Sequence, residues 1–133
     1  MLKEGMAKSQ IVAVLQGYVY DISRISALIP QGGGARRQAQ SRLSQLKHAV
    51  HSDYKQRYAI ARSPQLTPLE QKNLARGIND MFVALQALGV NSNPDTEWRN
   101  ALFAADIRIQ RCLAELQVSA ARAETVGSSS DWL

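Results

Sequence analysis

Hydrophobic residues recur along this chain in steps of three and four, which is the spacing of one face of an α-helix. The pattern covers four segments, 9–29, 35–62, 68–88 and 94–124, and predicts a helix in each. The β-branched run from Ile11 to Val14 is by itself compatible with a strand, but the longer repeat around it favours a helix. The positions predicted to be buried are Ile11, Leu15, Tyr18, Ile22, Ile25, Ile29, Ala39, Leu43, Leu46, Val50, Tyr54, Arg57 or Tyr58, Ala61, Leu74, Ile78, Met81, Leu85, Leu88, Trp98, Leu102, Ala105, Ile109, Cys112 and Leu116.

Proline, glycine and capping residues separate the four segments. Pro30 and the glycines at 32–34 end the first, and Pro64 ends the second because the residue before a proline is pushed out of helical dihedrals. Thr67-Pro68-Leu69-Glu70 has the pattern of a capping box with proline at the first helical position. Asn93-Pro94-Asp95 predicts the start of the last helix, because a capping side chain and an acid both suit a helix N-terminus.

The short breaks predict how the helices connect. Connections of this length place neighbouring helices antiparallel, so we expect an antiparallel up-down four-helix bundle, formed by residues 1–126 as a single domain. Gly127 and the three serines after it predict a flexible tail at 127–133. The helix at 35–62 would span roughly 40 Å at 1.5 Å per residue and is expected to project past one end of the bundle.

Charge is concentrated in the second of these segments. The 133 residues have a formal net charge of +5. Residues 35–63 contain seven basic side chains against a single acid, Asp53, whereas residues 89–133 are net acidic. A local concentration of positive charge attracts anionic partners more specifically than a uniform one, so this segment is the candidate binding surface.

A helical wheel separates the faces of the segment 35–62. Basic side chains fall within about 60° of one another, next to the apolar face, and Tyr54 and Tyr58 lie between the two. A straight basic stripe suits a nucleic-acid backbone, because each neutralised phosphate releases condensed counterions; the alternative is a solvated helix face. The residues predicted to bind nucleic acid are Arg36, Arg37, His48, His51, Lys55 and Arg62.

The glycine-rich turn before this segment has two interpretations. Its backbone N–H groups and the following helix N-terminus favour an anion, and Arg36 and Arg37 oppose the helix dipole unless an anion lies there. The other interpretation is an interhelical hinge. It is not a nucleotide-binding P-loop, because no Lys-Ser/Thr pair follows the glycines.

No catalytic, metal or cofactor site is predicted. His48 and His51 share a face, but a zinc site needs at least a third protein ligand, and none lies nearby in the sequence. Cys112 falls on the apolar face of its helix and is expected to act as a small buried hydrophobe. One cysteine forms no intrachain disulfide, no secretory signal is recognisable, and the apolar stretch at 11–29 is interrupted by charges. We therefore expect a cytoplasmic protein that is not an enzyme and has no membrane partner.

One short stretch has a family resemblance. Arg42-Leu43-Ser44-Gln45-Leu46-Lys47-His48 resembles the Arg-to-His signature of HEPN ribonucleases, which are also small helical bundles. The resemblance covers seven residues, and Leu43 stands where that family usually carries a polar residue. It implies ribonuclease activity with Arg42 and His48 as the site.

Two hypotheses on function follow, from different classes. The first is a basic helical subunit or accessory protein that contacts a nucleic-acid backbone without sequence specificity, within a larger assembly; helical small subunits of RNA-guided CRISPR effector complexes are an analogy at the level of fold. The second is a protein–protein adaptor or inhibitor whose basic stripe meets an acidic protein surface. Its C-terminal Asp131, Trp132 and Leu133 would then form a docking peptide. The HEPN-like ribonuclease is third, and oligomerisation remains open.

Overall fold

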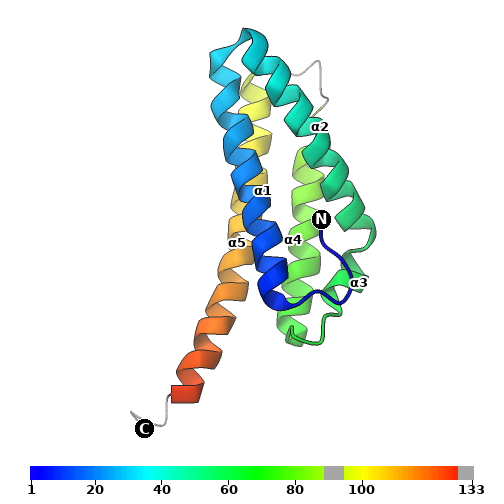
Figure 1. The fold of residues 1–133 in the computed structure, drawn as a ribbon, viewed down its shortest axis with the longest axis vertical. Coiled ribbons are helices and arrows are strands. Elements are labelled where there is room, and N and C mark those ends of the chain that lie inside the picture. The colour runs from blue at the N-terminus through cyan, green and yellow to red at the C-terminus, as the bar shows by residue number, and fades with distance from the viewer. Residues whose placement is uncertain (89–94, 129–133) are drawn as a thin grey trace.

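The computed structural model describes the backbone of residues 1–88 and 95–128, and side chains as far as Leu116. Within these residues the protein is all-α, as predicted, and no strand is present. In chain order the elements are α1 (Lys8–Leu28), the 3-10 helix η1 (Ile29–Gln31), α2 (Gly33–Lys55), α3 (Arg57–Ala61), α4 (Pro68–Gln86) and α5 (Asp95–Ser128) (Figure 1).

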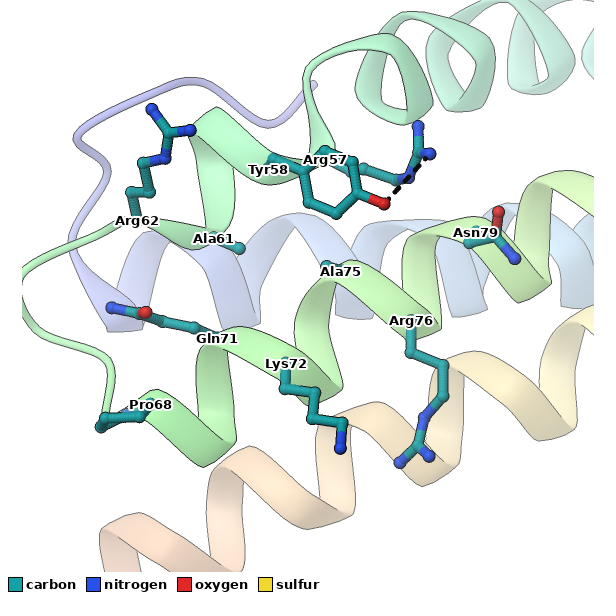
Figure 2. A pocket seen from close by; sticks show the side chains of 10 residues that line it. All are labelled: Arg57, Tyr58, Ala61, Arg62, Pro68, Gln71, Lys72, Ala75, Arg76 and Asn79. Atoms are coloured by element: carbon teal, nitrogen blue, oxygen red, sulfur yellow. Dashed lines mark hydrogen bonds between the residues drawn. The ribbon is translucent and has the colours of Figure 1, made fainter.

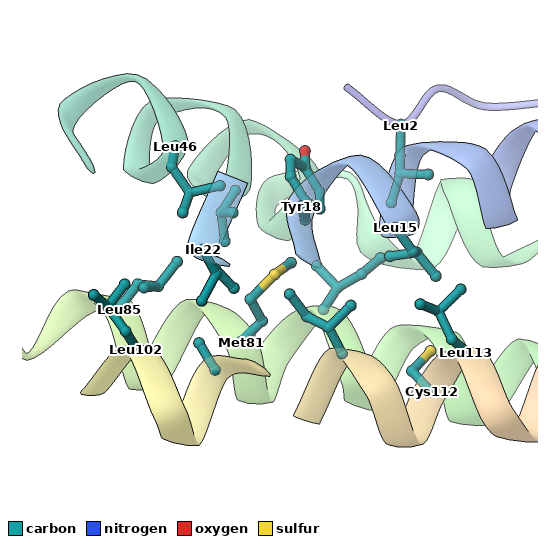
Figure 3. Packing of buried hydrophobic residues seen from close by; sticks show 14 of the residues in the cluster. Leu2, Leu15, Tyr18, Ile22, Leu46, Met81, Leu85, Leu102, Cys112 and Leu113 are labelled. Atoms are coloured by element: carbon teal, nitrogen blue, oxygen red, sulfur yellow. The ribbon is translucent and has the colours of Figure 1, made fainter. Parts of the chain in front are cut away.

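The core forms where the apolar faces of the long helices meet. α1 packs against α2 and α5, and α4 packs against α5, α2 and α3. All positions predicted to be buried in the first, third and fourth segments are buried (Figure 3). Each fully buried Leu, Ile or Met side chain contributes about 1.5–3 kcal/mol relative to an exposed one, so these faces dominate the stability of the fold.

The second predicted helix is broken, which corrects the expectation of one helix over 35–62. α2 ends at Lys55, and Gln56 has φ −106° and ψ 10° before α3 begins. The N–H of Gln56 donates to the Asp53 carbonyl at 3.1 Å, a three-residue bond that tightens the last turn. The Arg57 guanidinium donates to the Tyr54 carbonyl at 2.8 Å and satisfies a group that the break leaves without its helical partner.

The break changes the exposure of the residues after it. Tyr54 and Arg57, predicted on the apolar face, are partly buried, and Tyr58 is 62% exposed. Ala61 is buried as predicted, together with Ile60. The straight rod of about 40 Å is therefore absent, and α2 by itself spans about 35 Å at 1.5 Å per residue.

The turn between η1 and α2 depends on glycine. Gly32 and Gly33 have φ values of 67° and 54°, in the left-handed region that other residues rarely adopt. The helix starts at Gly33, two residues earlier than predicted, and the last residues of the first predicted helix form η1 instead, with Pro30 at its start.

The predicted capping box starts α4. The backbone N–H of Glu70 donates to the Thr67 hydroxyl at 3.2 Å, and the Thr67 N–H donates to the Glu70 carboxylate at 2.9 Å. Pro68 occupies the first helical position, where its missing N–H is not needed. The helix ends at Gln86, two residues before the predicted end, although Leu88 remains buried.

α5 has 34 residues and is longer than α2. Its C-terminal part extends beyond the ends of the other helices (Figure 1), so it is α5 and not α2 that projects. The helix includes Gly127 and Ser128, so the prediction of a flexible tail from residue 127 is wrong at its start. Once a helix has formed, each added residue gains a hydrogen bond, which offsets the cost of about 1 kcal/mol for a glycine. The predicted cap at Asn93-Pro94 and the tail from 129 onward lie outside the described residues.

Gly77 permits the close approach of α4 and α5. A Cβ atom on Gly77 would lie 2.9 Å from the Sγ atom and 3.0 Å from the Cβ atom of Cys112. We expect Gly77→Ala to lower the free energy of unfolding by about 1–3 kcal/mol, because overpacking outweighs the gain of up to about 1 kcal/mol in helix propensity. Chemical denaturation measures the change.

The matched control for this prediction removes the sulfur atom. Adding Cys112→Ala to Gly77→Ala should recover part of the lost stability, because the nearest clashing atom is then absent. An increase in stability for Gly77→Ala alone contradicts the prediction.

Candidate functional site

A groove lies between α3 and the outward face of α4 (Figure 2). Its volume is about 700 Å³, within the range of ligand-binding clefts. The α4 residues that line it are spaced at helical intervals on one face of that helix, and the small side chains of Ala61 and Ala75 leave room between the two helices. The lining residues are Arg57, Tyr58, Ala61, Arg62, Pro68, Gln71, Lys72, Ala75, Arg76 and Asn79.

The groove concentrates positive charge. Four of its lining residues, Arg57, Arg62, Lys72 and Arg76, are cationic, and none is acidic. Among the side chains that the structure describes, none of these four forms an ion pair with a carboxylate. Arg76 donates to the side-chain oxygen of Asn73 at 3.1 Å. Such a cluster produces a local positive potential that attracts anions.

Arg57 is held between two tyrosines. Its guanidinium carbon lies 4.1 Å from the Tyr54 ring centroid and 4.5 Å from the Tyr58 ring centroid. In addition to its bond to the Tyr54 carbonyl, the guanidinium donates to the Tyr58 hydroxyl at 3.4 Å (Figure 2). Cation–π contacts of this kind contribute about 0.5–1 kcal/mol each at exposed sites. Arg57 therefore fixes the orientation of the exposed Tyr58 ring.

The ring contacts continue beyond Tyr54. Its ring stacks on Phe82 of α4 with centroids 4.1 Å apart and 13° between the planes, and the His51 ring lies 5.5 Å from Phe82. We call Tyr58, Arg57, Tyr54, Phe82 and His51 the aromatic row. It connects the groove to a second cavity of about 230 Å³. The residues lining that cavity are Lys47, His48, Val50, His51, Phe82, Leu85 and Gln86.

Comparison of the chain with protein-family models, curated proteins and solved structures gave no match. The function therefore has to be argued from the geometry and charge of this surface. Among the described residues, no helix combines the length and apolarity needed to cross a membrane.

A buried carboxylate fixes the end of α2 beside the groove. Asp53 is 1% exposed and accepts hydrogen bonds from the Leu2 backbone N–H, at 3.0 Å, and from the Tyr18 hydroxyl. Burial raises the pKa of Asp53, and the two hydrogen bonds lower it only in part. Burial, together with the nearby Asp53 carboxylate, also raises the pKa of Tyr18. The N-terminal segment, residues 1–7, is thereby attached to the point where α2 breaks.

The same N-terminal segment is attached to the connection between α3 and α4. The hydroxyl of Ser63, which is buried, donates to the Met6 carbonyl at 2.8 Å, and the Lys8 N–H donates to the Gln65 side-chain oxygen at 2.9 Å. These bonds fix the two helices that form the walls of the groove relative to each other.

A second buried carboxylate fixes the start of α4. Glu70 is 3% exposed, pairs with the Lys8 ammonium, and accepts the Thr67 N–H of the capping box. Burial acts to raise the pKa of Glu70, but the Lys8 side chain and the Thr67 hydrogen bonds outweigh it, so the pKa lies below its usual value.

The pKa of Glu70 predicts how its contribution depends on pH. A lowered pKa in the folded state stabilises the protein above the unfolded-state pKa, and this stabilisation is lost as the pH falls through the folded-state value. We expect Glu70→Gln to lower the free energy of unfolding by about 1–2 kcal/mol at pH about 7 and by much less at pH about 2–3. Urea unfolding at the two pH values measures the difference; equal losses at both contradict it. The exposed Glu4→Gln is the matched control.

The structure separates the six residues predicted to bind nucleic acid. Arg62 follows α3 and lines the groove, and His48 and His51 line the second cavity. Lys55, at the end of α2, and Arg37, near its start, are exposed. The predicted straight stripe is not present, because the break at Gln56 changes the direction of the chain before Arg62. The six residues therefore form separate groups along the α2–α3 surface.

Arg36 has partners within the fold. It pairs with Asp95 at the start of α5, and its guanidinium lies 5.4 Å from the Trp98 ring centroid. The anion expected near this helix N-terminus is thus supplied by the protein itself. This contact joins the glycine turn to α5, and the hydrophobic environment explains why Trp98 is 1% exposed.

Sequence reasoning missed Lys72 and Arg76. The segment 64–88 has no net charge, so it did not stand out. Lys72, Arg76 and Asn79 do share a helical face, but only the packing of α3 on α4 places that face opposite Arg57 and Arg62. The local signal was therefore present, and its significance depends on tertiary structure.

The other sequence-derived candidates are less closely grouped. Arg42 and His48 are six residues apart on α2, which places them about 120° apart around the helix axis, and both are exposed. Burial raises the pKa of Cys112 to about 12, which suppresses the thiolate form at neutral pH. Within the described residues no cluster of three or more His, Cys, Asp or Glu side chains fits a metal ion. Asp131, Trp132 and Leu133 lie outside the described residues.

Proposed function

We propose that this protein binds the phosphate backbone of nucleic acid through the groove between α3 and α4, without sequence specificity and without catalysis. The observation that carries the proposal is the cluster of Arg57, Arg62, Lys72 and Arg76 in one groove that has no acidic lining residue. Arginine and lysine side chains that face a polyanion gain free energy by releasing its condensed counterions.

The surface next to the groove supports a backbone track. Lys55 is exposed at the end of α2, and Lys47, His48 and His51 line the second cavity at the far end of the aromatic row. A strand leaving the groove along the aromatic row would therefore meet further basic side chains.

We further propose that the protein acts as a subunit or accessory protein in a larger cytoplasmic assembly. Phe103 and Ile107 are 66% and 47% exposed, and their spacing of four residues places them on one side of α5. An exposed apolar strip of this kind is typical of a surface that contacts another protein.

The arrangement of the long helices also belongs to this proposal. We propose that α1, α2, α4 and α5 form an antiparallel up-down bundle. Its support is the set of packed pairs, α1 with α2 and α5, and α4 with α2 and α5, together with the short connections between successive helices. Such a bundle would present the α3–α4 groove as a rigid outer surface.

A binding titration across a salt series tests the proposed function. Fluorescently labelled single-stranded and double-stranded DNA and RNA are titrated with the protein at several salt concentrations, with labelled poly-L-glutamate as a polyanion that has no phosphates. The proposal predicts nucleic-acid binding that weakens steeply with salt. Binding of poly-L-glutamate alone would favour the acidic-protein hypothesis, and absence of nucleic-acid binding at low salt overturns the proposal.

A further inference from the structure

We infer that the groove selects single-stranded nucleic acid, and that Tyr58 is the platform on which one unpaired base stacks. The inference rests on the proposed function and adds to it the class of nucleic acid and the residue that determines the preference. It is carried by the position and rigidity of one aromatic side chain within the cationic groove.

Tyr58 has the exposure that a stacking platform requires. It is 62% exposed, although its aromatic ring would gain from burial, and it lines the groove together with the four cations. Figure 2 shows the ring between the backbones of α3 and α4, with its hydroxyl directed toward Arg57. An aromatic face next to cations is the arrangement that binds unpaired bases with little dependence on sequence.

The Tyr58 ring is also held in place before any ligand binds. Arg57 lies 4.5 Å from its centroid and donates to its hydroxyl at 3.4 Å, and Arg57 is itself fixed by the ring and the carbonyl of Tyr54. Tyr54 in turn stacks on Phe82. A side chain fixed by its neighbours loses less conformational entropy on binding, so these contacts favour a platform role over that of a loosely exposed ring.

The combination distinguishes single strands from duplexes. In a duplex the base faces are occupied by neighbouring bases, and exposing one costs a few kcal/mol of unstacking free energy. A single strand presents base faces and phosphates at the same time, so one base can stack on Tyr58 while adjacent phosphates meet Arg62 and Lys72 of the same groove. Cations alone would favour the higher charge density of a duplex.

The experiment compares three labelled DNAs of about 12 nucleotides: oligo-dT, an abasic strand with the same number of phosphates, and a duplex. The inference predicts that oligo-dT binds more tightly than the abasic strand. It also predicts that Tyr58→Ala weakens oligo-dT binding about 10-fold and leaves abasic-strand binding within about twofold. Tyr58→Trp should retain the preference, and Tyr20→Ala, at an exposed tyrosine of α1 outside the groove, is the matched control. Circular dichroism establishes that each variant is folded.

Each other outcome has a defined meaning. Equal affinity for oligo-dT and the abasic strand, or an equal loss for both in Tyr58→Ala, overturns the stacking inference and leaves the proposed backbone binding intact. Tighter binding of the duplex than of oligo-dT, unchanged by Tyr58→Ala, overturns the single-strand preference. Failure of the wild-type protein to bind any of the three DNAs overturns both proposals.

Discussion

Replacing Arg62, Lys72 and Arg76 together by glutamate is expected to lower affinity for nucleic acid about 100-fold or more at low salt. The three side chains line one groove, and each is exposed, so each can reach a phosphate without a large change in the fold. Removing three phosphate contacts and adding three repelling charges acts on the electrostatic term that dominates backbone binding. Fluorescence anisotropy with oligo-dT measures the change. Arg57 is left unchanged because it also orders the aromatic row.

The control variant has the same change in net charge at a different place. Lys3, Arg24 and Arg99 are exposed and lie in the N-terminal segment, α1 and α5, outside the groove lining. Their replacement by glutamate should weaken binding far less, by about 10-fold or less, through the overall charge alone. Equal losses in the two triple variants would show that total charge and not the groove determines binding.

Replacing Asp53 by alanine is expected to lower the free energy of unfolding by about 2–4 kcal/mol. The change leaves the buried Leu2 N–H and the buried Tyr18 hydroxyl without their acceptor and removes buried volume. For a chain of this size the midpoint of thermal unfolding should fall by roughly 10 °C. Differential scanning calorimetry measures it. We also expect weaker DNA binding, because the N-terminal segment fixes the walls of the groove.

A neutral isostere at Asp53 provides the control and a test of sign. Burial raises the pKa of Asp53, so its contribution to stability is complete below the unfolded-state pKa and is lost as the pH rises through the folded-state value. Asp53→Asn should therefore cost most at acidic pH and progressively less as the pH rises. A cost that instead grows with pH contradicts the assigned direction, and a negligible effect of Asp53→Ala contradicts the structural role. Asp106→Ala, at a less buried acid on α5, is the matched surface change.

The helices and the core could be predicted because their signals are local. The spacing of Ile11, Leu15 and Tyr18 places them on one face of a helix whatever the rest of the chain does, and all three are buried. The capping box at Thr67 and Glu70 is likewise a contact between residues three apart. These elements depend on few assumptions about tertiary structure.

The break at Gln56 could not be predicted in this way. It lies next to Asp53, whose partners Leu2 and Tyr18 are 51 and 35 residues away in sequence. A helical wheel treats Asp53 as an isolated acid in a basic segment, whereas the fold makes it a buried acceptor. The same reasoning explains Arg36, whose anionic partner Asp95 belongs to another helix.

The candidate site was predictable in part for the same reason. Arg62 belongs to the basic segment, and Tyr58 lies beside it, so composition alone draws attention to them. Lys72 and Arg76 belong to a segment without net charge, and only the contact between α3 and α4 assembles the four cations into one groove. The sequence indicated a basic surface, and tertiary packing determines which basic residues share it.

The central claim is that the groove neutralises phosphates, and the salt dependence of binding tests it most directly. The affinity for oligo-dT is measured across a salt series for the wild-type protein and for a variant with Arg62, Lys72 and Arg76 replaced by glutamine. Each lost phosphate contact should make the slope of log K against log salt concentration less negative by about 0.7, so the variant slope should be smaller by about 2. Equal slopes for the two proteins would contradict the claim.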